Sequence, residues 1–318
     1  MEKLAKAINI HQICAHFIKN SQNLLITSGA GMGVDSGLPD FRGPNGFYKA
    51  YPYFKQVGMK FEDAASPSFF KQDPKKYWYF YGHRFKTYQD TIPNEGFTRL
   101  LEWSQKCLQK SDKKDAPNHF IFTSNVDGQF QKAGFSDQNV VEAHGTIHKF
   151  QCDKCDIIED RRTEQIQLDT VKYEVVNIPK CLKCDQIVRP NILMFGDNSW
   201  LSYDVDQKVS NYTKWLNQII NESLVIIEVG AGSAIPTVRM SNEMVLEQRI
   251  NKNTMLIRIN PSELQYFNVK QDTISLTEYD VEELKLHKID EILQDQKYYI
   301  AIGEGGKSTL NKINEYLI

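Results

Sequence analysis

Short apolar runs alternate with stretches of helical spacing along much of the chain. Apolar side chains recur at helical intervals over residues 3–19, and a compact apolar run follows at Asn23 to Thr27. A run of this kind that ends in turn residues predicts a buried strand. The same pattern predicts strands at 119–127, 223–236, 254–262 and 297–306, and helical spacing predicts helices over 95–110, 210–221 and 237–250.

Strands that alternate with helices predict an α/β fold with a doubly wound parallel sheet. Most of the predicted strands end in Gly, Ser, Asn or Asp. Ligands of such sheets bind beyond the carboxyl ends of the strands, so we expect a nucleotide there. Two segments interrupt the alternation: residues 47–90 are rich in aromatic side chains, and residues 149–190 carry four of the six cysteines.

Composition excludes few classes of function. The 318 residues carry a formal net charge of −2, which gives no general attraction to nucleic acid or membranes. No apolar run approaches the roughly 20 residues that span a bilayer, and the first residues lack the pattern of a secretion signal. We therefore expect a cytoplasmic or nuclear protein that binds neither nucleic acid nor membranes directly. The oligomeric state is not indicated.

The glycine-rich stretch TSGAGMGVDSGLPDFRG, residues 27–43, follows the first predicted strand. Gly29 and Gly31 match two positions of the pattern G-x-G-x-x-G, which lets the backbone approach a pyrophosphate, but Val34 occupies the third. A plain tight turn is the alternative. The acidic residue that a dehydrogenase needs about 20 residues later has no clear counterpart, so hydride transfer is not supported.

A second glycine-rich stretch, AIGEGGKST at 301–309, resembles the phosphate loop of nucleotide hydrolases. That pattern requires glycine where Ala301 stands. We interpret this stretch as a glycine turn before a final helix.

The cysteines predict a metal site. Cys152 and Cys155 form one C-x-x-C pair, and Cys181 and Cys184 form another after 25 intervening residues. Four thiolates suit a closed, tetrahedral, structural Zn²⁺ site, with an insertion between the two pairs. Four unmetallated cysteines are the alternative. Cys14 and Cys107 are expected to be small buried apolar residues.

Several motifs then agree in order and spacing with one family. They are GAGMGVDSGLPDFRG (29–43), TSNVDGQFQKAG (123–134), EAHG (142–145), the two cysteine pairs, RPNILMFGD (189–197) and VGAGSAIP (229–236). From about residue 20 to 305 the chain resembles the sirtuins, the NAD-dependent protein-lysine deacylases.

The resemblance implies a domain organisation. A Rossmann-like, NAD-binding large domain would comprise residues 1–46, 91–148 and 190–318. The helical insertion 47–90 and the zinc-binding insertion 149–189 would form the small domain. NAD would be the co-substrate, one Zn²⁺ would be structural, and an acyl-lysine protein or peptide would bind in the cleft between the domains.

The resemblance also implies the site residues. His144 matches the catalytic base, and histidine suits this task because its pKa lies near neutral pH. His148 is the nearest rival for that role. Asn125 and Asp127 match the catalytic polar pair and would contact the ribose and the nicotinamide carboxamide. The other cofactor-binding residues would be Gly29, Ala30, Gly31, Met32, Pro39, Asp40, Phe41, Arg42, Ser124, Val126, Gly230, Ala231, Gly232, Ser233 and Asn260.

The chain departs from the family at three places, each of which concerns a single cofactor contact. Gly33 stands where Ser is usual, Ser124 stands where Gln is usual, and GAGS (230–233) replaces a Gly-Thr-Ser stretch. The proposed base, the ribose-binding Asn125 and the zinc ligands are retained.

The substrate residues are also assigned by resemblance. Ala65, Tyr81 and Arg84 match the branch of the family that removes succinyl and malonyl groups. The alternative is a helix with packed aromatics and a solvent-facing arginine. Met194, Phe195 and Gly196 belong to a segment that resembles the strand pairing with the substrate peptide, although Phe195 could instead be a core residue.

Protein-lysine deacetylation is the default activity. The alternatives are mono-ADP-ribosyl transfer or NAD hydrolysis by the same site, or a non-catalytic NAD-binding scaffold.

Overall fold

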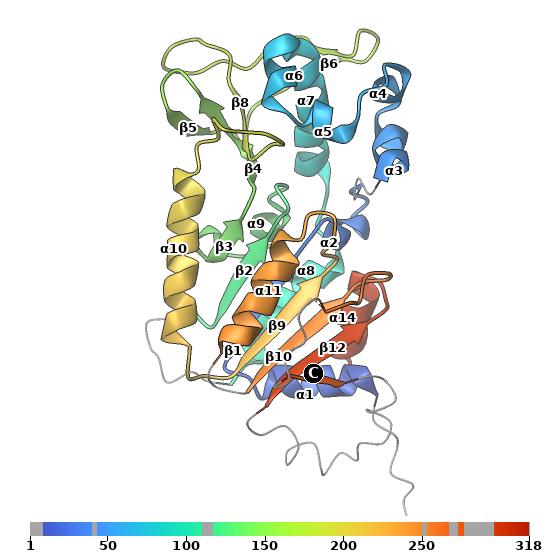
Figure 1. Cartoon of the computed structure of the whole chain (residues 1–318), viewed down its shortest axis with the longest axis vertical. Coiled ribbons are helices and arrows are strands. Elements are labelled where there is room, and N and C mark those ends of the chain that lie inside the picture. Colours follow the sequence, from blue (N-terminus) through green and yellow to red (C-terminus); the bar gives the residue numbers. More distant parts are fainter. Residues whose placement is uncertain are drawn as a thin grey trace, which may run out of the picture.

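The computed structural model describes residues 9–39, 43–109, 117–249, 253–266, 273–276 and 296–317. Within these residues, seven strands form one sheet in the order β11-β12-β10-β9-β1-β2-β3, and every pairing is parallel (Figure 1). The α/β class with a doubly wound parallel sheet is thus confirmed. The strands are β1 (Asn23–Ser28), β2 (His119–Thr123), β3 (Val140–Glu142), β9 (Leu224–Val229), β10 (Thr254–Ile259), β11 (Thr273–Leu276) and β12 (Lys297–Ile302).

Helices cover both faces of this sheet, which explains why its central strands are continuous apolar runs. The first face packs against α1 (Ile10–Lys19), α8 (Glu95–Lys106) and α14 (Gly306–Asn314), and the second against α10 (Tyr203–Gln218) and α11 (Thr237–Gln248). Strand β1 shows the alternation, because Leu24 and Ile26 join the first core whereas Leu25 joins the second.

A second group of elements lies above the sheet in Figure 1. Its strands form a three-stranded antiparallel sheet, β5-β4-β8, and a two-stranded ladder, β6-β7. Aromatic side chains of the helices and strands share one core. The elements are α3 (Gly43–Ala50), α4 (Pro52–Gln56), α5 (Phe61–Ala64), α6 (Pro67–Gln72), α7 (Pro74–Asp90), β4 (Gly145–Cys152), β5 (Ile157–Asp160), β6 (Leu168–Asp169), β7 (Glu174–Val175) and β8 (Arg189–Ile192).

Several predicted elements need correction. Strands β3 and β11 were not predicted, and the runs at 119–127 and 223–236 leave the sheet at Thr123 and Val229. Helix α10 comprises Tyr203–Gln218 and so begins earlier than the predicted 210–221. Its first turns are mostly polar and none of their residues is buried, so the sequence indicated them weakly. The turn before the final predicted helix is confirmed, because β12 ends at Ile302 and α14 begins at Gly306.

Two further predictions can be compared with the structure. Cys14 is buried in the first core as predicted, whereas Cys107 is only half-buried. Within the described ranges, no helix has the length and apolar character needed to cross a membrane. The domain boundaries given above remain predictions.

Candidate active site

Two glycine-rich loops meet at the carboxyl ends of β1 and β9. The Gly29 amide donates to the Val229 carbonyl at 3.1 Å, and the Gly31 amide donates to the Gly230 carbonyl at 3.0 Å. A Cβ atom on Gly31 would lie only 2.6 Å from the Gly230 Cα. Gly230 also has a φ of 63°, in the left-handed region that favours glycine. The two glycine loops therefore pack backbone against backbone, which leaves no room for a side chain. Gly31 is also the first residue of helix α2 (Gly31–Val34).

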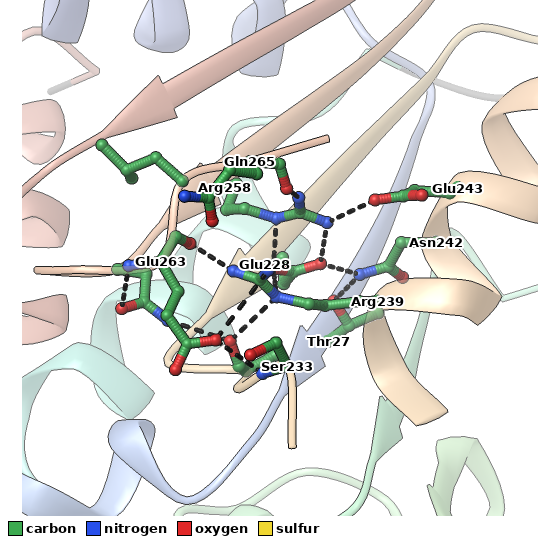
Figure 2. A network of polar contacts seen from close by, with 12 residues as sticks. Thr27, Glu228, Ser233, Arg239, Asn242, Glu243, Arg258, Glu263 and Gln265 are labelled. Atoms are coloured by element: carbon green, nitrogen blue, oxygen red, sulfur yellow. Dashed lines mark hydrogen bonds and ion pairs between the residues drawn. The ribbon is translucent and has the colours of Figure 1, made fainter. Parts of the chain in front are cut away.

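A buried network of charges lies behind the second loop (Figure 2). Glu228 on β9 forms two hydrogen bonds with Arg258 on β10, at 2.6 and 3.0 Å. Arg239 on α11 donates to the Ala231 carbonyl at 3.2 Å, and Asn242 donates to both Thr27 (2.7 Å) and Glu228 (2.9 Å). These contacts attach the loop and the start of α11 to the sheet.

Asn260 supports the same loop from the far side. Its side-chain amide donates to the Ala231 carbonyl at 2.9 Å, and its carbonyl oxygen accepts from the backbone amides of Ser262 and Glu263. Asn260 is fully buried, whereas Ser233 is exposed and its amide donates to the Glu263 carboxylate at 2.6 Å. Gly232 is half-buried. Glu263 was not predicted to take part in the site.

The loop after β2 carries the predicted polar pair. The Asn125 side chain donates to the Gly29 carbonyl at 3.0 Å, which joins this loop to the glycine loop. Asp127 is buried and accepts from the Gln129 amide at 3.0 Å, at the start of α9 (Gln129–Lys132). Burial raises the pKa of the Asp127 carboxyl to about 6, against the opposing effects of the Gln129 amide and the Arg84 charge. Ser124 and Val126 bind neighbouring strands through their backbones.

His144 lies in the turn between β3 and β4 and faces these loops. Its backbone carbonyl accepts from the Leu193 amide at 2.9 Å, and its Nε2 lies 3.1 Å from the hydroxyl of Thr237. Burial lowers the pKa of the imidazole, and a backbone hydrogen bond with Ser124 acts in the opposite direction. The ring is therefore mostly neutral at pH 7 and can accept a proton.

His148, the other candidate for the base, already has a hydrogen-bond partner. Its Nε2 lies 3.0 Å from the backbone carbonyl of Asp127. A carbonyl only accepts, so Nε2 carries the proton and this ring supports the Asp127 loop.

Of the remaining residues predicted to bind the cofactor, the structure describes Ala30, Met32 and Pro39. Met32 is buried and its side chain belongs to the first core, so only its backbone is available at the loop. Ala30 and Pro39 are half-buried. Asp40, Phe41 and Arg42 lie outside the described residues.

The residues predicted to hold the acyl group share the aromatic core. Ala65 and Tyr81 are buried there, together with Met194. Arg84 is 8% exposed, and its guanidinium donates from Nε (3.2 Å) and Nη2 (3.0 Å) to the Tyr88 hydroxyl. A solvent-facing Arg84, the alternative raised by the sequence, is therefore wrong.

The segment expected to pair with a peptide is irregular. Strand β8 ends at Ile192, and the Phe195 amide donates to the Ala65 carbonyl at 3.2 Å. Phe195 is 40% exposed, so it is not a core residue, and Gly196 has a φ of 66°.

The four predicted zinc ligands converge. The sulfur atoms of Cys152, Cys155, Cys181 and Cys184 all lie within 4.8 Å of one another. Tetrahedral Zn²⁺ with Zn–S bonds of about 2.3 Å holds its sulfurs about 3.8 Å apart, so this arrangement fits a closed structural zinc site. The 25 residues between the two pairs form β5, β6 and β7.

A cavity of about 540 Å³ shares Asp127 with the site but is lined by neither His144 nor the glycine loops. Charged residues line it, including Glu142, Lys149 and Lys208. Glu142 is buried, and its carboxylate accepts from the Gly128 amide at 3.2 Å and from Gln131 at 3.1 Å. Burial raises the pKa of this carboxyl to about 7. Glu142 directly follows the apolar residues of β3, which was the only sequence signal that it would be buried.

Comparison with known proteins agrees with this geometry. The model of the Sir2 family matches residues 29–226, which is more than half of the chain. The chain belongs to the Sir2 family. This Sir2-family chain is 31% identical over 213 residues to an NAD-dependent protein deacylase of Aquifex aeolicus, covering 67% of the chain and 74% of that protein.

Two further relatives of this Sir2-family chain show how coverage varies. It is 29% identical over 239 residues to an NAD-dependent protein deacetylase of Saccharolobus solfataricus, covering 75% of the chain and 82% of that protein. The match to an NAD-dependent protein deacylase of Thermococcus sibiricus has 31% identity but spans 57% of the chain and only 62% of the relative.

Solved structures share the fold. A Sir2 homologue in complex with NAD superposes with a TM-score of 0.63 at 22% identity, covering 98% of this chain and 97% of that one.

Proposed function

We propose that this chain is an NAD-dependent protein-lysine deacylase that converts NAD, an acyl-lysine and one water molecule into nicotinamide, free lysine and O-acyl-ADP-ribose. One observation carries the proposal. The two glycine loops, the Asn125–Asp127 loop and a neutral His144 converge beyond the carboxyl ends of β1, β2 and β9. The names of the relatives, which are deacetylases and deacylases, support the same activity.

The proposed roles follow from the chemistry of each group. NAD supplies an activated ribose–nicotinamide bond, and the carbonyl oxygen of the acyl-lysine attacks C1′ as nicotinamide leaves. The backbones of Gly29–Met32 and Gly230–Ser233 would line the phosphates and the adenosine half. Asn125 would bind the ribose, and Asp127 would bind the nicotinamide carboxamide. His144 Nε2 would take a proton from a ribose hydroxyl, so that this oxygen can attack the acyl carbon.

The cysteine cluster has a structural role in this proposal. Cys152, Cys155, Cys181 and Cys184 would hold one Zn²⁺ as thiolates, and four protein ligands leave no position for a reacting water. No step of the reaction passes through the metal.

The activity is tested by incubating the purified chain with NAD and matched acetyl-lysine and succinyl-lysine peptides, and by following the products with mass spectrometry. We expect deacylated peptide and O-acyl-ADP-ribose in equal amounts. His144→Ala should lower this rate by at least roughly 100-fold, because a general base contributes about 10²–10⁴-fold. Nicotinamide release without deacylation would contradict the proposal and favour NAD hydrolysis or ADP-ribosyl transfer. No turnover with any peptide would favour an NAD-binding scaffold.

We propose that Arg84 extends the specificity to acidic acyl groups such as succinyl and malonyl. The guanidinium is buried at the edge of the aromatic core that holds Ala65 and Tyr81, within 5.4 Å of the Tyr81 ring centre. A guanidinium in such a setting can bind a carboxylate through two parallel hydrogen bonds. Acetyl-lysine needs no such partner, so deacetylation remains the default activity.

The acyl preference is tested with two variants of the same residue. Arg84→Met should lower desuccinylation by at least roughly 100-fold while deacetylation changes by less than about threefold. Arg84→Lys keeps the charge but loses the planar fork, and its desuccinylation should fall between the two. An equal loss of both activities in Arg84→Met would show that the residue supports the fold of the pocket instead.

We propose that the partner is an acyl-lysine protein of the cytoplasm or nucleus, bound through the backbone of residues 193–197. Two structurally similar Sir2 chains were solved with p53 peptides, at TM-scores of 0.57. Cell fractionation and cross-linking of an acyl-lysine peptide to this segment would test the location and the binding mode.

A further inference from the structure

The imidazole of His144 has a side-chain partner that the sequence analysis did not identify. The Thr237 hydroxyl lies 3.1 Å from His144 Nε2. Thr237 is the first residue of α11, and its side chain is half-buried. The only sequence signal is its place after Pro236, where a hydroxyl residue would ordinarily be read as part of a helix start.

Helix α11 holds this hydroxyl in a fixed place. Two residues later, Arg239 donates to the carbonyls of Ala231 and Glu263, and Asn242 in the next turn donates to Thr27 and Glu228 (Figure 2). Each partner belongs to the sheet or to the loops at its edge. Because the start of α11 is tied to the sheet, the Thr237 hydroxyl offers a rigid reference point for the imidazole.

The surroundings of the ring favour one tautomer of the neutral imidazole. A backbone hydrogen bond with Ser124 acts to raise the pKa of His144, as a carbonyl that accepts a ring N–H does. A neutral imidazole has one N–H, so a tautomer with the proton on Nδ1 leaves Nε2, the nitrogen next to Thr237, as an acceptor. The Thr237 hydroxyl can rotate, so it can donate to Nε2 when the ring proton is on Nδ1. Nε2 is the nitrogen that must accept the ribose proton.

No carboxylate orients this base within the part of the chain that the structure describes. The nearby acidic side chains have other partners, because Asp127 accepts from the Gln129 amide and Glu142 accepts from the Gly128 amide. Many enzymes orient a base with a third group that is often a carboxylate. Here a hydroxyl and a backbone group occupy the two ends of the ring.

We propose that Thr237 is a positioning residue for His144, which holds the imidazole plane and keeps Nε2 directed into the site as an acceptor until the ribose hydroxyl replaces the threonine. This inference rests on the proposed deacylase function. In the step it prepares, the ribose O–H bond breaks and its proton passes to Nε2. The oxygen electron pair forms the bond to the acyl carbon, and the carbon–nitrogen π pair of the imidate moves onto the lysine nitrogen. The Thr237 hydroxyl keeps its own proton throughout.

The first test needs no activity. Histidine-selective ¹⁵N NMR of the full-length, zinc-loaded protein reports the protonation and mobility of each ring, and His144→Ala identifies the His144 signals. We expect a single, unprotonated Nε2 signal in the wild type, and a broadened or doubled signal in Thr237→Val. Thr237→Ser should restore the single signal. An unchanged His144 signal in Thr237→Val would overturn the proposal even if the protein proves not to be a deacylase.

The second test separates the step that uses the base from the step before it. Exchange of labelled nicotinamide into NAD reports attack at C1′, whereas deacylation also requires the proton transfer to His144. We expect Thr237→Val to lower deacylation roughly 10-fold, the effect of losing one orienting hydrogen bond, while nicotinamide exchange stays within about threefold of wild type. Thr237→Ser should recover deacylation to within about threefold.

A matched control makes the same chemical change elsewhere. Thr213 is exposed on α10 and its hydroxyl bonds only the Val209 carbonyl, so Thr213→Val should leave both rates unchanged. Equal losses of exchange and deacylation in Thr237→Val would overturn the proposal, as would a Thr237→Ser variant as impaired as the valine variant. If Thr237→Val does not fold, the same comparison is made with Thr237→Ala.

Discussion

The parallel sheet and the cysteine-bearing region are held together in different ways. The central strands of the sheet are six residues long, pair on both sides, and fill two cores with mainly aliphatic side chains. In the second region several strands have only two to four residues, and one core contains the rings of Phe54, Trp78, Phe80 and others together with the four cysteines. We therefore expect the first region to be stabilised by its long backbone ladder and two aliphatic cores. The second should depend more on its aromatic core and on Zn²⁺ bound by the cysteines.

Removal of the metal should have the largest effect, and it should affect the two regions differently. Chelation, or the variant Cys181→Ser, should unfold the elements around the cysteines while the parallel sheet stays folded. Structural zinc sites contribute apparent binding energies of about 10–16 kcal/mol, which far exceeds the stability of a small region without its metal. Hydrogen exchange followed by mass spectrometry should show lost protection in β4, β5 and β8 with protection kept in β1 and β9.

The control for that experiment is Cys14→Ser, which changes a cysteine of the sheet region. Cys14 is fully buried in the aliphatic core, so this variant should weaken the sheet without altering zinc content. Equal loss of protection in both regions after chelation would contradict the separation of their stabilising forces.

Within the sheet, loss of a buried charge should have the next largest effect. Glu228→Gln should destabilise the protein by about 3–5 kcal/mol, because it leaves Arg258 and Arg239 buried without their shared carboxylate. Both arginine side chains and that of Glu228 are fully buried. Urea denaturation of the metal-loaded protein measures the change. The double variant Glu228→Leu with Arg258→Met removes this pair but takes one partner each from Arg239 and Glu243, so it should recover only part of the loss. A loss below about 1 kcal/mol in the single variant would show that water reaches the network.

Glu142 lies where the two regions meet. It is the last residue of β3 in the sheet, and it lines the cavity next to the second region. Burial raises the pKa of its carboxyl from 4.5 to about 7, so the folded protein binds more protons than the unfolded chain between these values. The contribution of Glu142 to stability is therefore greatest below pH 4.5 and is lost as the pH rises through 7. Above pH 7 the cost reaches up to about 3 kcal/mol.

Glu142→Gln removes that titration. The variant should be more stable than wild type at pH 8, and the difference should shrink as the pH falls toward 4.5. Denaturation midpoints measured across this range check the prediction. A pH-independent difference between the two proteins would mean that the carboxyl is not buried in solution.

The smallest expected effect concerns the turn after the first cysteine pair. Asp156 is exposed and has a φ of 51°, in the left-handed region where glycine carries no penalty from Cβ. Asp156→Gly should stabilise the metal-loaded protein by about 0.5 kcal/mol, and Asp156→Val should destabilise it by about 1–2 kcal/mol. Thermal denaturation with saturating zinc distinguishes them. If both variants weaken the protein equally, the aspartate side chain itself supports the turn.

Much of the fold could be predicted because both faces of the sheet are covered. Burial on both faces turns β1, β9, β10 and β12 into apolar runs that sequence alone reveals. Strand β3 has only three residues, Val140–Glu142, and so lacks the length that makes a run recognisable. The first turns of helix α10 are mostly polar and contain no buried residue before Tyr212, so only the spacing of Val205, Val209 and Tyr212 indicates that the helix begins earlier.

The residues of the candidate site could be predicted where the groups that act together lie close to one another in the sequence. Spacing within each C-x-x-C pair was enough to predict that four sulfurs would converge. The partners of Glu228 and His144 were not predictable in this way, because Arg258 and Thr237 lie 30 and 93 residues away. Such pairs depend on strand order and loop geometry, which a pattern of single residues does not contain.

The parallel pairing of β1 also has a consequence for synthesis. Asn23 is aligned with Leu224, so a neighbour of this central strand is made about 200 residues later. At roughly 5–20 residues per second, the ribosome needs about 10–40 s to produce it. During that interval β1 lacks at least one of its two neighbouring strands on the nascent chain. A chaperone that covers the unpaired edge of β1 would act on a chain whose second neighbour does not yet exist.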